Sequence, residues 1–335
     1  MNDIYSLVKI SKQAMHKYKL RMRYVQNVST IVVNECSRIR KNHKRMSCRK
    51  MYVRVKDHVP VGRDIFEQIG FANGFKLQII RSKQRTTWAT KLDVFENLLE
   101  GKTLNGMNQA FQSDIFYFSV EGESHYGITI IDVYSRKLLA LHVSRTLRAE
   151  QNIIALKKAI LEREGQSLEG CIFHSDRGGQ YISEDQKELL RELKMIPSMC
   201  KLPQENAYSE RVQGTIKHEY IYPENLTKKN LEKQIKRIQH YYNNERPHAS
   251  LGNRTPNEYE EYINKLPLVE RPEATVYKWT HPLLTITPVT NKKEKSSKKE
   301  KINNKSFKVK KVNLFQARSV YHLSSIIYHP NEIFF

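Results

Sequence analysis

Three apolar runs rich in aromatic and β-branched residues mark the middle of the chain and predict consecutive β-strands. They begin at Asp114, Gly127 and Lys137, and short polar turns separate them. A fourth, shorter run over 171–175 follows a turn that contains glycine. Apolar residues at helical spacing flank this fourth run, over 149–164 and 184–194. Because three antiparallel strands are followed by alternating helices and strands, the pattern predicts an α/β fold with a mixed sheet.

Capping signals and apolar spacing place further helices in the second half of the chain. Ser183-x-x-Gln186 is a capping-box pattern at the start of the helix over 184–194. Asn206 is positioned to cap a helix that runs through about Tyr220. Apolar residues at helical spacing predict another helix over Leu231–Tyr242.

The head of the chain has a different pattern, which predicts short basic helices between turn signals. Ser11 and Ser29 are candidate N-caps, and Pro60-Val-Gly-Arg63 precedes a run of apolar residues at helical spacing. A polar, basic stretch over 78–90 has the composition of a linker. We therefore predict three regions: a helical region over 1–90, a catalytic core over 91–265, and a C-terminal extension over 266–335.

Charge separates the two flanks from the middle of the chain. The chain has 57 Lys or Arg against 35 Asp or Glu, a net charge of +22. Residues 1–90 hold 20 of these basic residues against five acidic ones, and residues 291–335 hold 11 against three, so the part between them is almost neutral. A polyanionic partner is therefore expected at the flanks. The lysine-rich tail after Pro288 is predicted to be disordered or a DNA-seeking arm, and 315–335 suggests no role.

Composition also excludes several classes of protein. No apolar stretch approaches the roughly 18 residues of a membrane span, and the N-terminus lacks the apolar segment of a signal peptide. We therefore expect a soluble, cytoplasmic protein. The cysteines are far apart in the sequence, which argues against a disulfide framework and a structural zinc site and predicts buried, reduced thiols. They are Cys36, Cys48, Cys171 and Cys200.

Three acidic residues stand at positions from which carboxylates can converge. Asp114 begins the first predicted strand, Asp176 follows the strand over 171–175, and Glu210 lies in the first turns of the helix after Asn206. Converging carboxylates repel one another unless a cation neutralises them. Oxygen ligands without a His or Cys pair favour Mg²⁺ or Mn²⁺ over zinc. Two such ions would form a clamp for a phosphodiester.

Each of these residues also has an ordinary structural explanation. Aspartates at strand ends are more often turn residues, and a glutamate in a first helical turn often complements the helix dipole. His174 is either a metal ligand or, as we favour, a neighbour that supports Asp176. Lys217 lies seven residues after Glu210 on the same helical face, about 10 Å along the helix; it is either a phosphate contact or a solvated surface residue. The three carboxylates together favour the metal site.

The ordered motifs of the chain resemble the catalytic open reading frame of bacterial insertion-sequence transposases with a DDE, retroviral-integrase-type core. Ser113-Asp114-Ile-Phe-Tyr117 resembles the first-aspartate strand, and His174-Ser-Asp176-Arg-Gly-Gly-Gln-Tyr181 the second-aspartate motif. The stretch from Glu205 to Lys217 is similar to the glutamate helix. Further matching segments are Asp132–Arg136, Tyr241–His248 and Thr255-Pro256, and the basic head resembles the helix-turn-helix-like segment that precedes such cores.

The resemblance implies an RNase H-like mixed five-stranded sheet flanked by helices, preceded by a small basic all-α domain. It implies a polynucleotidyl transferase in which Asp114, Asp176 and Glu210 bind two Mg²⁺ or Mn²⁺ ions, with His174 and Asn206 supporting them. It also implies binding of double-stranded DNA, both terminal inverted repeats and target, by a homo-oligomer, and fusion to or partnership with the product of an upstream frame. The expected location is the bacterial cytoplasm, at the nucleoid when bound to DNA. The expected DNA contacts are Lys217, Arg49, Arg63 and Arg246.

Two departures from the family pattern keep alternatives open. Thirty-three residues separate Asp176 from Glu210, two fewer than the family usually has, and the loop over 200–204 accounts for the difference. Glu205 stands where most members have aspartate. An intact glutamate-helix motif favours a shortened loop over a lost ligand. The alternatives are a catalytically inactive DNA-binding relic and an integrase-type nuclease that acts on other DNA.

Overall fold

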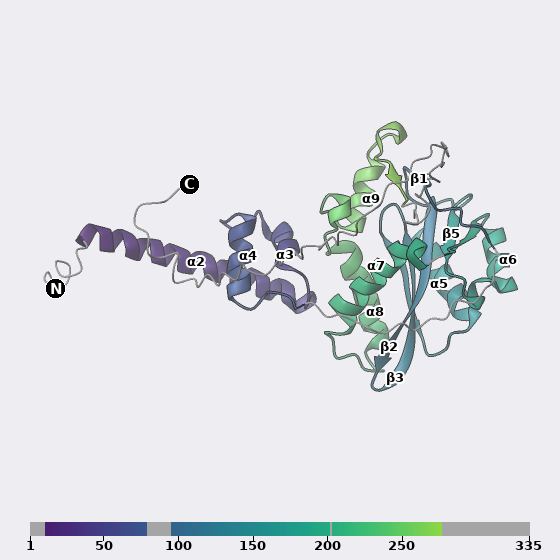
Figure 1. Ribbon diagram of the computed structural model, residues 1–335, viewed down its shortest axis with the longest axis horizontal. Coiled ribbons are helices and arrows are strands. Elements are labelled where there is room, and N and C mark those ends of the chain that lie inside the picture. The colour runs from purple at the N-terminus through teal and green to yellow at the C-terminus, as the bar shows by residue number, and fades with distance from the viewer. Residues whose placement is uncertain (1–10, 79–94, 202, 277–335) are drawn as a thin grey trace, which may run out of the picture. The chain divides into compact units, whose positions relative to one another are not determined.

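A computed structural model of the protein describes residues 11–78, 95–201 and 203–276 (Figure 1). The predicted boundary near residue 90 and the lysine-rich tail lie outside these residues. Within them, the chain forms a helical head and a core built on one mixed sheet. The head has its own hydrophobic cluster, separate from the clusters of the core.

The head is formed by helices α2 (Lys12–Asn42), α3 (Cys48–Val55) and α4 (Arg63–Ala72). The Ser11 side chain caps α2 by accepting a hydrogen bond from the Ala14 N–H at 3.1 Å, as predicted. The prediction of an N-cap at Ser29 was wrong, because Ser29 lies inside α2. No Gly or Pro interrupts α2, and its buried stripe over 28–39 packs against the other two helices.

The core contains the mixed five-stranded sheet that the sequence predicted. Its order is β4-β3-β2-β5-β6, with the first three strands antiparallel and β5 and β6 running parallel to β2. One glycine in it is required by packing, since a Cβ atom at Gly127 would lie 2.2 Å from the Phe116 ring. The strands are β2 (Ala110–Val120), β3 (Glu123–Asp132), β4 (Leu138–Ser144), β5 (Ile172–Ser175) and β6 (Ile196–Met199).

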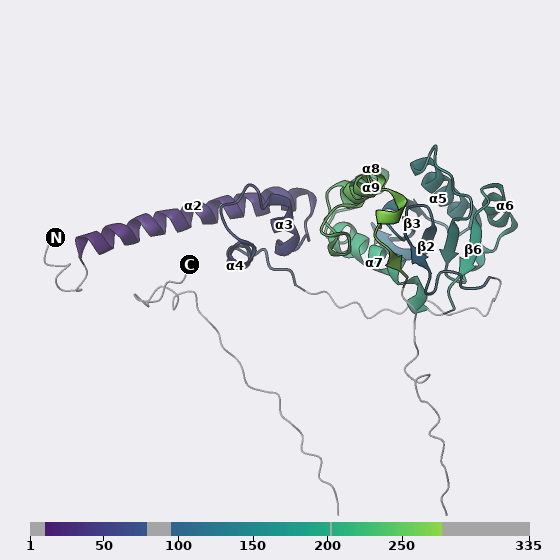
Figure 2. The same cartoon turned by 90° about the horizontal axis from the view of Figure 1, so that it is seen from above.

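Helices cover both faces of this sheet (Figure 2). One face packs against α5 (Ala149–Glu162) and α6 (Glu184–Glu192). The other face packs against α7 (Ala207–Thr215), a π-helical turn (Ile216–Ile221) and α8 (Leu231–Asn244). The sheet therefore lies between two layers of helices, with one hydrophobic cluster on each of its faces. Short 3-10 helices occur at Gly179–Tyr181, Pro203–Asn206, Ala249–Leu251 and Leu268–Glu270.

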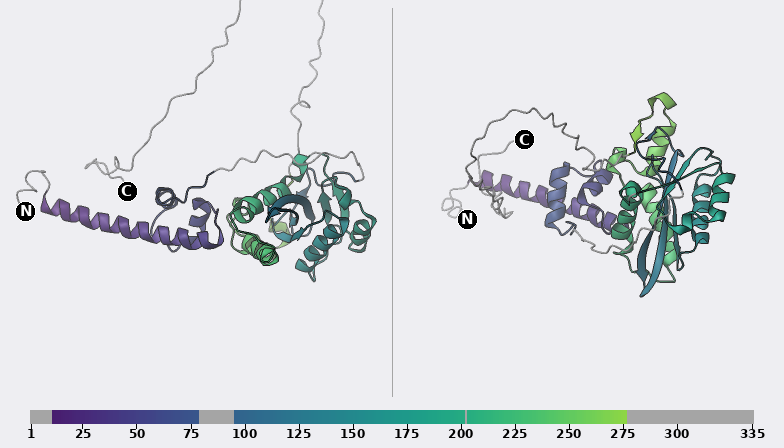
Figure 3. Two further views of the ribbon diagram at one scale, coloured as in Figure 1. Left: turned by 90° about the horizontal axis from the view of Figure 1, so that it is seen from below. Right: turned by 45° about the vertical axis from the view of Figure 1, so that its right-hand side comes forward.

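Some elements were not predicted from the sequence. They are β6, the helix α9 (Pro256–Asn264), and a small second sheet of β1 (Thr103–Leu104) and β7 (Ala274–Thr275). Helix α9 begins with a capping box between Thr255 and Glu258. Residues from β1, α9 and the segment through Val276 share one hydrophobic cluster, so packing against the core continues past residue 265. Figure 3 shows these elements at one end of the long strands β2 and β3.

A buried ion cluster joins α5 and α9 to the turn after β3. Arg163 donates to Glu260 at 2.8 Å and to Asp132 at 3.2 Å, and Ser135 Oγ donates to Glu260 at 2.6 Å. Asp132 also accepts hydrogen bonds from the backbone N–H groups of the turn. Removing one partner from such a cluster leaves an uncompensated buried charge, so these residues hold the turn and the two helices together.

Two composition-based expectations can be checked on the described residues. All four cysteines are buried and free, as predicted. Among the helices that the structure describes, none combines the length and apolarity that crossing a bilayer requires.

Candidate active site

The three candidate carboxylates come from neighbouring elements of the core. Asp114 is on β2, Asp176 follows β5, and Glu210 is in the first turns of α7. Strands β2 and β5 are parallel neighbours in which Gln112 pairs with His174. Asp114 and Asp176 each lie two residues further along and so follow the same pair. Asp114 does not begin its strand as predicted, since β2 starts at Ala110, whereas Asp176 comes directly after the end of β5.

Asp114 lies within electrostatic range of both other carboxylates. Burial, together with the charges of Asp176 and Glu210, raises the pKa of Asp114 to about 8. Burial also raises the pKa of Asp176 and that of Glu210. Lys217 opposes the rise at Asp114 and at Glu210, but the net effect on both carboxyl groups remains upward. The site therefore has an excess of negative charge that a cation would neutralise.

Hydrogen bonds from the backbone orient both aspartates. Asp114 Oδ1 accepts from the Ile115 N–H at 2.9 Å, and Asp176 Oδ1 accepts from the Gly178 N–H at 3.0 Å. The turn after Asp176 does not use a left-handed backbone conformation at either glycine. Gly178 has φ −67°, and Gly179 begins a 3-10 helix.

Lys217 lies within electrostatic range of Asp114 and Glu210. It lies in the π-helical turn after α7, and its Nζ is 5.7 Å from the centre of the Phe116 ring. Burial lowers the pKa of Lys217, whereas the charges of Asp114 and Glu210 raise it. The ammonium group is therefore close enough to both carboxylates to interact with them.

His174 is fully buried and hydrogen-bonds to Ser198 rather than to Asp176. Ser198 Oγ lies 2.9 Å from His174 Nδ1, accepts from the Leu98 N–H and donates to the Glu96 carbonyl. The Ser198 hydroxyl has one proton, which it donates to the Glu96 carbonyl. The proton in the bond between His174 and Ser198 is therefore on His174 Nδ1, which donates to Ser198 Oγ. Burial lowers the pKa of His174 to about 4, so the ring is neutral at pH 7 and supports the strand.

Two of the expected DNA contacts lie on the surface of the head. Arg49 is exposed on α3, and Arg63 begins α4 with its side chain about half exposed and paired with Asp64 at 2.8 Å. Both guanidinium groups are thus accessible to a phosphate.

Arg246 does not have the surface position expected of a DNA contact. It is 7% exposed, and its Nε and Nη2 each lie 2.8 Å from a carboxylate oxygen of Glu219. A buried guanidinium in such a two-point pair has its donors occupied within the fold. We therefore correct this expectation and assign Arg246 to the stability of the core.

The donor chemistry of the site suits a hard divalent cation, but the ligands do not form a closed cage. Within the described ranges, no three His, Cys, Asp or Glu side chains are gathered in a way that could hold a metal ion. Oxygen donors from Asp114, Asp176 and Glu210 match the preference of Mg²⁺ and Mn²⁺. The residues present therefore fit such an ion chemically.

Gln112 was not predicted from the sequence; it is fully buried on β2, two residues before Asp114. Its side chain accepts a hydrogen bond from the Ser209 N–H at 2.9 Å and donates one to the Glu205 carbonyl at 3.1 Å. The available signal was a polar residue at alternate spacing from Asp114, and so on the same strand face.

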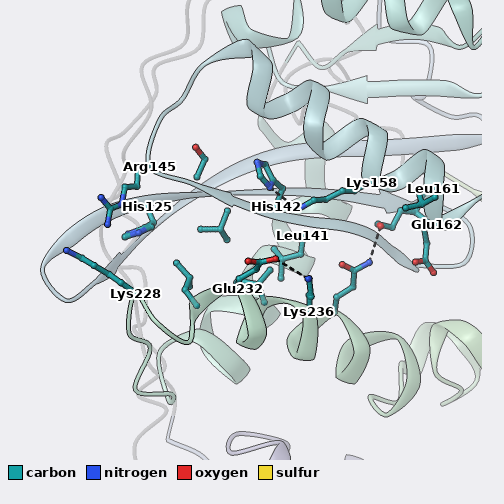
Figure 4. Close-up of a pocket in the computed structure, with 16 residues that line it drawn as sticks. His125, Leu141, His142, Arg145, Lys158, Leu161, Glu162, Lys228, Glu232 and Lys236 are labelled. Atoms are coloured by element: carbon teal, nitrogen blue, oxygen red, sulfur yellow. Dashed lines mark hydrogen bonds and ion pairs between the residues drawn. The ribbon is translucent and has the colours of Figure 1, made fainter.

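A groove of about 690 Å³ lies at the opposite edge of the sheet, between α5, α8 and β4 (Figure 4). Lys158 and Leu161 line it from α5, and Ile235 and Lys236 from α8. Lys158 Nζ donates to His142 Nδ1 at 3.1 Å. None of the three carboxylates lines this groove, so it is not part of the candidate active site.

Family models, curated relatives and solved structures are similar to parts of this chain. Two family models, both described as "Integrase core domain", match the chain, one over residues 105–202 and the other over residues 192–256. An uncharacterized transposase-like protein of Haemophilus influenzae is 30% identical over 207 residues, which are 61% of this chain and 92% of that protein. The transposase InsF of insertion sequence IS3A from Escherichia coli is 30% identical over 174 residues, 50% of this chain and 60% of InsF. The catalytic core of HTLV-2 integrase is 17% identical with a TM-score of 0.37, over 46% of this chain and 97% of that one.

The sheet order, the position of the carboxylates and the domain matches define an integrase-type core. The chain belongs to the family of insertion-sequence transposases that carry such a core. The resemblance found in its motifs is thereby confirmed.

Proposed function

We propose that this chain is a DNA transposase whose carboxylate site catalyses metal-dependent phosphodiester cleavage and strand transfer. The observation that carries the proposal is the electrostatic state of Asp114. Its pKa is raised by burial and by two further carboxylates, which come from other elements of the same core. Carboxylates with perturbed pKa values that come from adjacent elements are typical of a catalytic site.

Asp114, Asp176 and Glu210 would hold two Mg²⁺ or Mn²⁺ ions. When bound, these ions would activate the attacking oxygen and stabilise the leaving oxygen. His174, held neutral by burial, would keep β5 and β6 in place behind Asp176. Asn206, whose Nδ2 donates to the Ser113 carbonyl at 3.3 Å, would support the start of the glutamate helix.

The proposed reaction has two balanced transfers at phosphorus. In the first, water adds its oxygen to a phosphodiester at the element end, the bond to the 3′-oxygen breaks, and that oxygen takes up a proton. In the second, this 3′-hydroxyl attacks a target phosphodiester and displaces the target's own 3′-oxygen. Lys217, which faces Asp114 and Glu210, would hold a neighbouring phosphate in register.

The proposed partners are terminal inverted repeats and target DNA, bound as duplexes. The exposed Arg49 and Arg63, in the strongly basic head, would contact phosphates. We also propose that the active form is a homo-oligomer, in fusion or partnership with the product of an upstream frame. The proposed location is the bacterial cytoplasm, with the nucleoid as the site of action.

The test is cleavage and strand transfer by Asp176→Ala, with Asp185→Ala as the matched control because Asp185 is exposed on α6. We expect Asp176→Ala to abolish both reactions in Mg²⁺ and Mn²⁺ while binding to terminal-repeat DNA stays within about twofold. Retained cleavage in the variant would reject the metal assignment. Wild-type cleavage of duplexes with and without terminal repeats at equal rates would favour the nuclease alternative, and an inactive wild-type chain would favour the relic.

A further inference from the structure

The first turn of α7 is capped by a side chain from the neighbouring strand β2. Asn206 occupies the N-cap position, but its side chain does not accept from a backbone N–H of the helix. Gln112 Oε1 instead accepts from the Ser209 N–H, at the third position of the helix, at 2.9 Å. An unpaired N–H at this position is the group that an N-cap side chain normally satisfies.

The second half of the Gln112 amide is used as well. Gln112 Nε2 donates to the Glu205 carbonyl at 3.1 Å. The two backbone partners fix the orientation of the amide, because only its oxygen can accept from Ser209 and only its nitrogen can donate to Glu205. Gln112 and Ser209 are both fully buried, so water cannot replace either bond.

Two neighbouring contacts tie the same segment down. Asn206, which does not cap the helix, donates from Nδ2 to the Ser113 carbonyl at 3.3 Å. Glu205 Oε2 accepts from the Lys201 N–H at 2.6 Å and from Asn97 Nδ2 at 2.8 Å. The segment from Glu205 to Ser209 is therefore attached to β2 immediately before Asp114, and Glu210 is the next residue.

We infer that Gln112 is a positioning residue that holds Glu210 of α7 in register with Asp114 of β2. The inference rests on the proposed function, since it concerns the relative position of two of the proposed metal ligands. Gln112 and Asp114 lie on the same face of β2, about 7 Å apart along the strand. Displacing a proposed metal ligand such as Glu210 by about 1 Å can lower the rate of the reaction about 100-fold. We therefore expect the two buried hydrogen bonds of Gln112 to affect the rate of catalysis.

The test compares Gln112→Met with Gln186→Met. Methionine keeps the length of the side chain and removes both hydrogen bonds. Gln186 is the matched control because it is fully buried on α6 and its side-chain oxygen and nitrogen make no hydrogen bond. Three quantities are measured in each variant: hydrogen exchange of the Ser209 amide, the Mn²⁺ concentration that gives half the maximal rise in Tm, and kcat and KM for cleavage of terminal-repeat DNA.

For Gln112→Met we expect faster exchange at Ser209, a Mn²⁺ midpoint at least tenfold higher, and a kcat lower by about 10- to 100-fold with KM within about twofold. Gln186→Met should leave all three unchanged. Two results for Gln112→Met would overturn the inference. One is faster hydrogen exchange at the Ser209 amide with an unchanged Mn²⁺ midpoint and kcat, and the other is unchanged exchange at this amide. If Gln112→Met does not fold, Gln112→Asn, one methylene too short to hold both partners, is measured in its place with the same expected directions.

The failure of the proposed function gives a different result. A folded wild-type protein that neither cleaves DNA nor changes its Tm with Mn²⁺ overturns the proposed function, and the inference falls with it. A wild-type protein that responds to Mn²⁺ and cleaves, with Gln112→Met equal to it in both measurements, overturns the inference alone.

Discussion

The raised pKa of Asp114 predicts that this carboxylate destabilises the metal-free protein, and that Asp114→Asn stabilises it. The folded-state pKa is about 8, against an ordinary value of 3.8. At about 1.36 kcal/mol for each pKa unit, the difference sets an upper limit of about 6 kcal/mol. Asp114 keeps partial contact with solvent. Screening lowers the expected penalty to about 2–4 kcal/mol.

The sign follows from which state holds the proton. Below the unfolded pKa of 3.8 both states are protonated and the penalty is absent. Between this value and about 8 the folded protein keeps a proton that the unfolded chain has released, so stability falls as the pH rises. Above about 8 both states are ionised and the full penalty remains. Because asparagine does not titrate, the advantage of Asp114→Asn should grow across this range.

Urea denaturation in EDTA at pH 5, 7 and 9 measures this advantage. We expect Asp114→Asn to exceed the wild type by about 2 kcal/mol more at pH 9 than at pH 5. Asp57→Asn, at an exposed position in the head, should show no such trend. Added Mg²⁺ should stabilise the wild type at pH 9 and leave Asp114→Asn almost unchanged. An advantage that is the same at pH 5 and pH 9 would refute the reasoning.

Three further predictions concern charges outside the carboxylate site. In the double variant Arg49→Gln, Arg63→Gln, the slope of log K for DNA binding against log salt concentration should fall by about 0.9 for each lost phosphate contact. Titrations at several salt concentrations measure this slope, and an unchanged slope would show that neither residue contacts DNA. Arg163→Met should lower the free energy of unfolding by about 3–5 kcal/mol, because it leaves buried carboxylates unpaired, and a loss below about 1 kcal/mol would contradict this. Arg246→Gln should lower stability by a similar amount, since it breaks the pair with Glu219, while DNA affinity of the folded fraction stays within about twofold; a larger loss of affinity would restore Arg246 as a DNA contact.

The elements predicted correctly are those whose signal is local. Strands β2, β3 and β4 are runs of apolar and β-branched residues, and the Ser183 side chain accepts from the Gln186 N–H as its capping pattern predicted. The carboxylates were singled out because they stand in an ordered set of motifs, although Asp114 lies inside β2 and not at its start. Their predicted roles as metal ligands follow from convergence and await the experiments above.

The features that the sequence did not reveal depend on contacts between distant residues. Ser29 has the chemistry of an N-cap, but the buried stripe that packs α2 against α3 and α4 continues through it. Arg246 stands in a motif shared with the family, yet its partner Glu219 comes from the π-helical turn and buries it. Gln112 caps a helix that begins 95 residues later in the chain, between positions 112 and 207. No periodicity in a single sequence encodes such a pair.

The charge distribution of the chain and the pKa of Asp114 together predict the conditions under which a DNA phosphate can approach the carboxylates of the core. The basic charge of the head would attract DNA, whereas the carboxylates of the core would repel it. Below about pH 8 the metal-free site lessens its own repulsion by keeping a proton on Asp114. A divalent cation must displace this proton to bind, so its affinity should rise with pH up to about 8 and then level off. The positive charge of the bound cation would then outweigh the charge of the carboxylates, so the proposed site would attract a phosphate.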